Sequence, residues 1–169
     1  LAQTLIRAFE HPRVTRLDGA FYVTFAADTD EGCRLGIART EDFRSFELMT
    51  VRNERDARNG VLFPERIGGD CMMFARPNNV AAEGGAATGD FIELSRSRDL
   101  RTWTRVGPVM GGRPHYWDEL IGSGPPPVKT REGWLHVYHG VARHLASAHV
   151  YQAGVVLLDL EDPSKVVAR

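Results

Sequence analysis

Two stretches of this 169-residue chain share one pattern and decide its fold: IARTEDFRSF at residues 37–46 and LSRSRDLRTW at residues 94–103. Each holds a short apolar run, a polar turn that contains an aspartate, an apolar residue and then an aromatic residue, and they are 57 residues apart throughout. Self-similarity at a fixed spacing indicates a repeat architecture. The equivalent aspartates, Asp42 and Asp99, are interpreted as turn residues and not as a catalytic pair.

A second element occurs three times. Each copy begins at a proline, continues as a short extended run and closes at a glycine turn; the copies begin at Pro12, Pro64 and Pro127. Apolar strands are predicted directly after them, at Phe21–Phe25, Cys71–Phe74 and Trp134–Tyr138. Proline at a strand start and glycine at a hairpin tip are positions that a sheet tolerates.

The prolines are 52 and 63 residues apart, and about four short strands in each interval favour the blades of a β-propeller. Helical periodicity is absent. We therefore predict an all-β fold with a single β-propeller domain over residues 1–169, about three blades and a Gly/Ala-rich loop at Val80–Asp90. Propellers close with about four to eight blades. The prediction is thus a partial propeller, or a ring that another copy completes as a homo-oligomer.

Composition excludes several classes of partner. The 21 Lys and Arg residues against 22 Asp and Glu give a net charge of −1, so no bulk basic field attracts nucleic acid or an anionic membrane. No apolar run approaches the ~18 residues of a membrane span, and no charged-then-apolar leader opens the chain. Two cysteines, Cys33 and Cys71, are too few for a disulfide framework, and we expect a cytoplasmic protein.

Other catalytic chemistries lack support in the sequence. Four histidines lie close together, at His136, His139, His144 and His149. His136 and His139 are an odd number of positions apart and would face opposite sides of a strand. Zinc-ligand spacing is absent, so no metal site is expected. No nucleophile elbow, phosphate-binding glycine loop or dinucleotide fingerprint occurs.

A set of more specific motifs runs through nearly the whole chain in order. They are EHPRV at 10–14, RNGVLFPE at 58–65, FARP at 74–77, WDELIGSGPPPVKT at 117–130, GW at 133–134, YHGV at 138–141 and YQAGVVLLDLEDPSK at 151–165. Together these segments resemble glycoside hydrolase family 130, the β-mannoside phosphorylases and related mannosidases. The resemblance implies a five-bladed propeller, of which this chain holds about three blades.

The resemblance also implies a phosphate site. Phosphorylases of this family place cations and hydrogen-bond donors at positions that match Arg58, Asn59, Arg76, Lys129, His139 and Tyr151. Phosphate carries close to two negative charges near neutral pH and needs several convergent donors, for which arginine is favoured by its bidentate fork. The plainer interpretation is that an arginine of a β-protein is solvated or paired at the surface, and that Lys129 ends a stiff proline segment.

The sequence departs from the family at His11. The family's proton donor is the Asp of a Glu-Asp-Pro-Arg segment, and His11 stands at that position. An imidazolium can donate a proton, and an unperturbed pKa of ~6.5 suits a general acid at neutral pH. Three interpretations stay open: His11 is the working acid, the activity is altered, or the acid is lost and only sugar binding remains. Strand alternation would turn the neighbouring Glu10 to the other face.

The resemblance thus favours inverting phosphorolysis of β-mannosides, or of related β-linked oligosaccharides, with release of α-mannose 1-phosphate. His11 would take the place of the acid, and Arg13 and Asp118 would help to shape the sugar subsite. Inorganic phosphate is the co-substrate, and no organic cofactor or metal is expected. The alternatives are a catalytically silent carbohydrate-binding propeller, an inverting β-mannosidase and a purely structural fragment.

Overall fold

The computed structural model describes residues 6–52, 54–80, 88–142 and 150–169, and these form strands and turns without a helix. The first sheet contains β1 (Ile6–Leu17), β2 (Ala20–Thr29), β3 (Gly32–Thr40) and β4 (Glu47–Arg52). The second contains β5 (Ala57–Leu62), β6 (Cys71–Pro77), β7 (Phe91–Ser97) and β8 (Thr104–Gly111). The third contains β9 (Leu120–Ser123), β10 (Val128–Lys129), β11 (Trp134–Ala142), β12 (Val150–Leu158) and β13 (Val166–Ala168).

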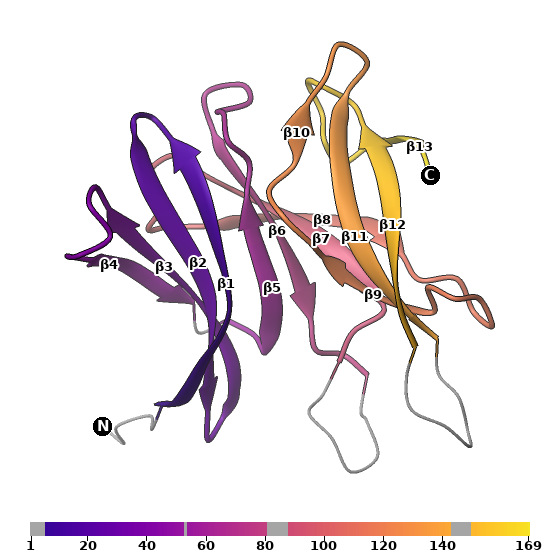
Figure 1. Ribbon diagram of the computed structural model, residues 1–169, viewed down its shortest axis with the longest axis horizontal. Coiled ribbons are helices and arrows are strands. Elements are labelled where there is room, and N and C mark those ends of the chain that lie inside the picture. Colours follow the sequence, from indigo (N-terminus) through magenta and orange to yellow (C-terminus); the bar gives the residue numbers. More distant parts are fainter. Residues whose placement is uncertain (1–5, 53, 81–87, 143–149) are drawn as a thin grey trace.

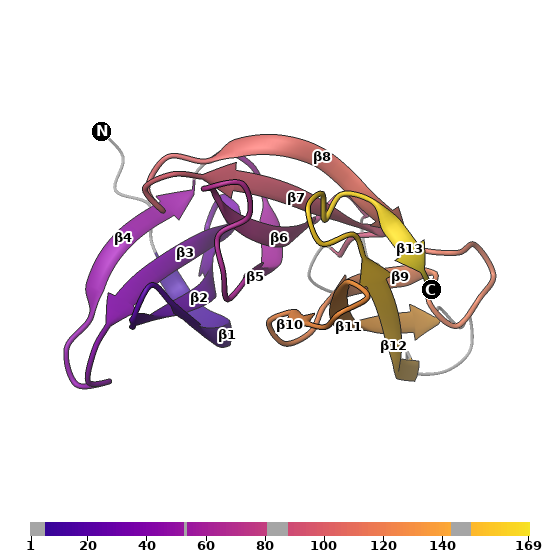
Figure 2. The ribbon, with the colours of Figure 1, turned by 90° about the horizontal axis from the view of Figure 1, so that it is seen from above.

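Each sheet is an antiparallel meander whose strands follow chain order. The three sheets stand side by side along an arc. Their first strands lie toward the inner side of the curve and their last strands toward the outer side (Figures 1 and 2). Radial sheets of this kind are propeller blades. The prediction of an all-β, partial propeller is confirmed, and we refer to the sheets as blades 1, 2 and 3.

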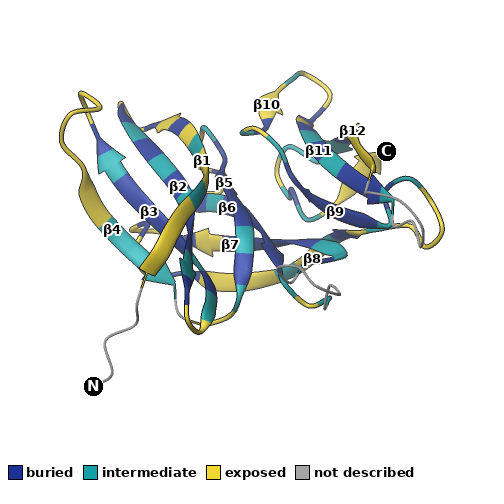
Figure 3. Cartoon of the chain, turned by 60° about the horizontal axis from the view of Figure 1, so that its bottom comes forward, coloured by how far each residue is buried: buried dark blue, intermediate teal, exposed yellow. Residues whose placement is uncertain are grey.

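The hydrophobic core lies between the blades. One cluster joins blades 1 and 2 through residues such as Tyr22, Ile37 and Met73, and a second joins blades 2 and 3 through residues such as Phe74 and Trp134. Buried positions alternate with partly buried ones along strands such as β2 and β3 (Figure 3). Removal of this apolar surface from water is the main source of the stability of the fold.

Exposed large apolar side chains are distributed unevenly among the described residues. Blade 1 carries Ile6, Phe9, Val14, Phe43, Phe46 and Leu48, and blade 3 carries Val128, Leu135, Val150, Tyr151, Val155, Val166 and Val167. Of the described residues of blade 2 only Val106 belongs to this group, and Tyr116 lies in the segment between β8 and β9. The middle blade has a neighbour on each side, whereas each outer blade has one, as a partial propeller requires.

The repeated turns have the same geometry in both blades. The side-chain oxygen of Asp42 accepts hydrogen bonds from the backbone N–H groups of Arg44 and Ser45 at 2.9 and 3.0 Å. Asp99 accepts the equivalent bonds from residues 101 and 102 at 2.9 and 2.7 Å. These bonds lower the pKa of both carboxyl groups, that of Asp99 to about 2. The interpretation of both aspartates as turn residues is confirmed.

The three prolines occupy comparable places, on or just after the first strand of a blade and ahead of the second. The repeat that they mark therefore begins part-way through each blade. In blade 3 the first strand is broken into β9 and β10, which pair with the same side of β11. The prolines at 125–127 lie in the break, since proline cannot donate to a ladder.

Two further observations concern the cysteines and membrane-spanning helices. Both cysteines are free and buried, in agreement with the absence of a disulfide framework. Among the residues that the structure describes, no helix is long and apolar enough to cross a membrane. Most of the predicted loop at Val80–Asp90 lies outside the described residues, and its ends are held by an isolated bridge between Val80 and Thr88.

Candidate functional site

Arg58 and Arg76 form the centre of a cationic cluster in blade 2. They are direct partners in the β5–β6 register, and opposite residues of an antiparallel pair project from the same face. Both side chains are largely buried, and among the described residues the Nε–H of each has no hydrogen-bond partner. Burial, and next the charge of Arg58, lower the pKa of Arg76 to about 10. Two like charges and spare donors held out of water are an arrangement that an anion would stabilise.

The same backbone irregularity occurs on the first strands of two neighbouring blades. One extra residue follows Glu10 in β1 relative to β2, and one extra residue follows Arg58 in β5 relative to β6. Each bulge holds a residue in the left-handed region, His11 with φ 52° and Asn59 with φ 55°. Histidine and asparagine tolerate this region better than most residues, and such strain clusters at functional sites. By this equivalence Glu10 corresponds to Arg58, and His11 corresponds to Asn59.

Blade 3 contributes His139 and Tyr151 to the same cluster. His139 pairs with Gly122 across β9 and β11, and a side chain at Gly122 would collide with both His139 and the amide of Asn59. The rings of His139 and Tyr151 are 6.0 Å apart, centroid to centroid. Burial, followed by the charges of Arg76, Arg13 and His11, lowers the pKa of His139 to about 4. His139 is therefore a neutral imidazole near neutral pH.

Arg13 ties blade 1 to blade 3. Its Nε donates to the carbonyl oxygen of Gly124 at 2.7 Å, and its Nη2 donates to the carbonyl oxygen of Ser123 at 2.9 Å. Its Nη1 donates to the carbonyl oxygen of His11 at 2.7 Å. Burial lowers the pKa of Arg13. Most of its donors are thus used to fix the backbone around His11 and the break in the first strand of blade 3.

His11 and Glu10 lie on the same side of β1, contrary to the expectation from strand alternation. His11 Nε2 is 3.7 Å from Glu10 Oε2, because the left-handed residue in the bulge interrupts the two-residue alternation. Burial, and next the charge of Arg13, lower the pKa of His11, whereas Glu10 raises it. The candidate acid therefore lies among cations, with one carboxylate beside it.

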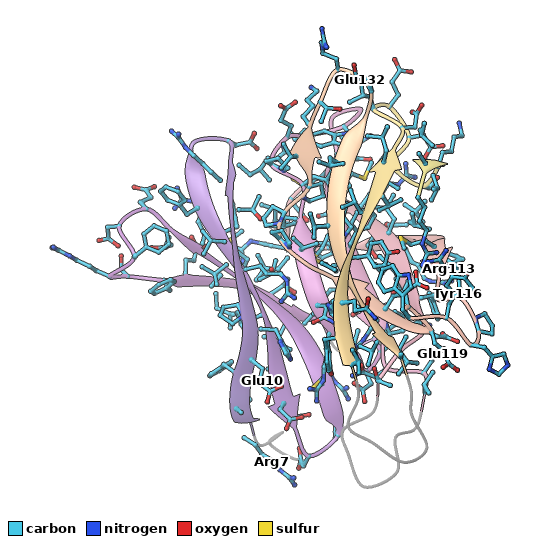
Figure 4. The ribbon with its side chains drawn as sticks, turned by 45° about the vertical axis from the view of Figure 1, so that its right-hand side comes forward. Arg7, Glu10, Arg113, Tyr116, Glu119 and Glu132 are labelled. Carbon is cyan, nitrogen blue, oxygen red and sulfur yellow. The ribbon has the colours of Figure 1, made fainter. Side chains whose placement is uncertain are left out.

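Lys129 is not brought to this cluster. Its Nζ donates to Glu65 Oε2 at 2.6 Å, and it lies over the Trp134 ring, 5.6 Å from the centroid. It pairs with Trp134 at the start of β11, whereas His139 lies further along the same strand. Glu132, in the adjoining hairpin, is at the opposite end of the molecule from Glu10 (Figure 4). The expected approach of Lys129 to Arg58 and Arg76 does not occur in the described structure.

Asp118 is also placed apart from the cluster. Its side chain is fully buried, and it accepts hydrogen bonds from Arg113 Nε at 2.8 Å, Tyr138 Oη at 2.9 Å and Arg169 Nη2 at 2.6 Å. Burial would raise its pKa, but these bonds leave the pKa below its usual value. Tyr138 and His139 alternate along β11, so Asp118 lies behind the sheet face that carries His139.

His136 faces the core, opposite to His139, as the odd spacing predicts. Its ring lies 5.0 Å from that of Phe74, centroid to centroid, and neither ring nitrogen has a hydrogen-bond partner among the residues that the structure describes. Burial, with a smaller effect of Arg13, lowers its pKa to about 4. Among the described residues no three His, Cys, Asp or Glu side chains gather as metal ligands. His144 and His149 lie outside the described residues.

Sequence reasoning missed the residues that support the arginines. Glu10 Oε2 accepts a hydrogen bond from Arg58 Nη1 at 3.0 Å, and Asn78 Oδ1 accepts one from Arg76 Nη2 at 2.9 Å. Asp56 in turn accepts from Asn78. Glu10 opens the motif EHPRV but was expected to turn away from His11, and no motif marked Asn78 or Asp56.

The fold and this cluster define a β-propeller protein with a buried cationic site at the meeting of three blades. The family model described as beta-1,4-mannooligosaccharide phosphorylase matches residues 4–169. The chain therefore belongs to glycoside hydrolase family 130, as its motifs indicated.

Individual relatives agree with the family assignment. The chain is 32% identical to a 1,2-beta-oligomannan phosphorylase of Thermoanaerobacter sp. (strain X514), covering 97% of this chain and 52% of that protein. It is 36% identical to a beta-1,4-mannooligosaccharide phosphorylase of Ruminococcus albus, covering 94% and 46%. The structure of a beta-1,2-mannobiose phosphorylase from Listeria innocua superimposes with a TM-score of 0.80 at 32% identity, covering 94% and 43%. The chain thus spans about half the length of these relatives.

Proposed function

We propose that the protein to which this chain belongs catalyses inverting phosphorolysis of β-mannosides, with release of α-mannose 1-phosphate. The observation that carries the proposal is the buried, cross-strand pair of Arg58 and Arg76 in the same cluster as His11. A glycosidase that activates water has no need of two arginines facing each other, whereas a dianionic nucleophile does. Relatives that are named phosphorylases of mannosides support the same substrate class.

The proposed chemistry needs one nucleophile and one acid. Hydrogenphosphate, held by Arg58 and Arg76, attacks the anomeric carbon, and the glycosidic C–O bond breaks with both electrons passing to the leaving oxygen. His11, as the imidazolium, supplies the proton that this oxygen takes up. The proton that hydrogenphosphate loses as its oxygen bonds to carbon replaces the one that His11 gave. A single displacement inverts the anomeric configuration.

We assign supporting roles by position. Asn59, His139 and Tyr151 supply polar groups around the phosphate, since they lie with the two arginines. Arg13 holds the edge of the sugar subsite through its bonds to the backbone of blade 3. Lys129 and Asp118, which sequence reasoning placed in the site, are assigned to the fold because of their contacts elsewhere.

The remaining features of the whole protein follow the same proposal. Its partners are an oligosaccharide and inorganic phosphate, which is a co-substrate, and no organic cofactor enters the mechanism. We keep a single propeller domain over residues 1–169, a cytoplasmic location and a possible homo-oligomer as predictions.

The decisive experiment is an assay of mannose 1-phosphate release by the full-length protein from β-1,2- and β-1,4-mannobiose, with and without phosphate. We expect release only with phosphate, and a loss of roughly 10²- to 10⁴-fold in His11→Ala, the usual contribution of a positioned acid. An activated leaving group, which needs little protonation, should be much less affected.

Two outcomes would contradict the proposal. Release of free mannose at equal rates with and without phosphate would identify a hydrolase. No turnover of any mannoside, together with a gain of phosphorolysis in His11→Asp, would identify a protein that binds carbohydrate and has lost its acid.

A further inference from the structure

Glu10 lies between the candidate acid and a candidate phosphate ligand. One oxygen, Oε2, accepts a hydrogen bond from Arg58 Nη1 at 3.0 Å and lies 3.7 Å from Nε2 of His11. The second distance exceeds a hydrogen bond, so the carboxylate is bonded to the arginine and only close to the imidazole. Glu10 lies on the lower part of blade 1, at the end of the molecule opposite to Glu132 (Figure 4).

The charges that face His11 come from several strands. Arg13 and Glu10 lie on β1, Arg58 on β5 and Arg76 on β6, and the neutral ring of His139 faces it from β11. Burial opposes protonation of His11 most strongly, and the three guanidinium groups act in the same direction. Glu10 is the carboxylate that offsets them among the described residues.

Phosphate would change this balance, because it competes for the same donor. Arg58 donates its Nη1–H group to Glu10, its Nη2 lies 3.8 Å from Asp28 Oδ1, and Arg76 lies opposite it in the strand register. A dianion repels the carboxylate and offers the guanidinium a stronger acceptor. Within the part of the chain that the structure describes, the only other ion-pair nitrogen within 4 Å of the Glu10 carboxylate is Nε2 of His11.

We propose that Glu10 is a positioning residue for His11, and that it exchanges partners when phosphate binds. Phosphate takes the N–H of Arg58, and the Glu10 carboxylate turns to Nε2 of His11 and holds the ring as the imidazolium. Binding of phosphate then takes up one proton from solvent at His11, which prepares the acid only when the nucleophile is present. This inference rests on the proposed function of the site.

The bulge in β1 is the reason that this pair exists. With regular alternation, Glu10 and His11 would point to opposite faces of β1. The left-handed backbone of His11 brings the two side chains together. Glu10 stands before the bulge of blade 1 as Arg58 stands before the equivalent bulge of blade 2. The left-handed backbone of His11 costs strain energy, and it places the Glu10 carboxylate beside the candidate acid.

Histidine NMR and kinetics of the full-length protein test the exchange. The His11 signal is identified by its loss in His11→Ala, and its pKa is measured with and without inorganic phosphate in wild type and in Glu10→Gln. We expect phosphate to raise the pKa of His11 in wild type, and Glu10→Gln to lower it by about one unit, as removal of a close opposite charge does. The alkaline limb of the rate profile should move to lower pH by the same amount.

The kinetic split separates this role from a merely structural one. Glu10→Gln should reduce kcat at neutral pH about tenfold, the change that one pKa unit produces, without raising KM for phosphate. Glu10→Asp, which keeps the charge, should restore part of the lost rate. Glu47→Gln is a matched control, since Glu47 also pairs with an arginine of the next blade, Arg101 at 2.7 Å, and is 55% exposed against 40% for Glu10.

Three results would overturn the inference while leaving the proposed function intact. They are an unchanged His11 pKa in Glu10→Gln, a rise in KM for phosphate equal to the fall in kcat, and the same profile shift in Glu47→Gln. The NMR titration needs no turnover. An inactive wild type whose His11 pKa still falls in Glu10→Gln would therefore support the Glu10–His11 pair and reject the proposed function alone.

Discussion

Asp118 and Arg76 are both buried, yet their surroundings are opposite in kind. Asp118 is 0% exposed and accepts hydrogen bonds from two arginines and a tyrosine. Arg76 is 8% exposed, donates to Asn78 and faces the like charge of Arg58. A buried polar group that serves the fold is saturated with partners. A buried group that keeps spare donors beside a like charge marks a place where a ligand supplies the missing partner.

Loss of Arg76 should have the largest effect in this comparison. We expect Arg76→Met to reduce kcat/KM for phosphate by roughly 10²- to 10³-fold, the typical cost of removing a charged donor from a site. The free energy of unfolding should be unchanged or higher, because a like-charge contact disappears. Steady-state kinetics and thermal denaturation measure the two effects. An equal loss of affinity for the mannoside would contradict the assignment to phosphate.

Asp118→Asn should show the reverse pattern. Breaking a buried ion pair leaves its partners uncompensated, and we expect a loss of about 3 kcal/mol in the free energy of unfolding, near the lower end of the usual range because Arg113 can reach solvent. KM for phosphate should not change at temperatures where the variant is folded. Urea denaturation and kinetics provide the measurements. A stable variant with a raised KM for mannoside would instead place Asp118 in the sugar subsite.

His136, on the core-facing side of β11, makes the stability of the protein depend on pH. The pKa of His136 is about 4 in the folded protein against 6.5 unperturbed, so the unfolded chain binds the proton first as pH falls. Stability should therefore decline between pH 6.5 and 4, by about 3 kcal/mol from this residue. His136→Leu should remove that part of the decline, and it should stabilise the protein by about 1–3 kcal/mol at neutral pH, since two unpaired polar atoms leave the core. A neutral-pH stability below wild type would show that the imidazole has a partner.

Lys129→Ala should have the smallest effect. Its ion pair with Glu65 is about half exposed on both sides, and such pairs contribute about 0.2–1 kcal/mol. We expect a change of that size in the free energy of unfolding and no change in KM for phosphate. A rise of tenfold or more in KM for phosphate would contradict this assignment and place Lys129 in the phosphate site with Arg58 and Arg76.

The repeat predicted the fold because turns and strand starts depend on local chemistry. Asp42 and Asp99 close their turns with bonds to residues two and three positions ahead, so their pattern is visible in the sequence. The predicted strands at Phe21–Phe25, Cys71–Phe74 and Trp134–Tyr138 form the N-terminal parts of β2, β6 and β11. The site was less predictable, because it is made where three blades meet and not within one repeat.

The sequence by itself determined the all-β class, the blade repeat and the family, and it indicated the two arginines. These properties depend on hydrogen bonds within a turn, on the alternation along a strand and on motifs of contiguous residues. Only the tertiary structure decided which charges share a site. It placed Lys129 beside Glu65 and Asp118 beside Arg113, and it brought Glu10 between His11 and Arg58 through a bulge that reversed the expected direction of a side chain. Electrostatic interactions depend on distance in space, and a single left-handed residue changes that distance without any sign in the periodicity.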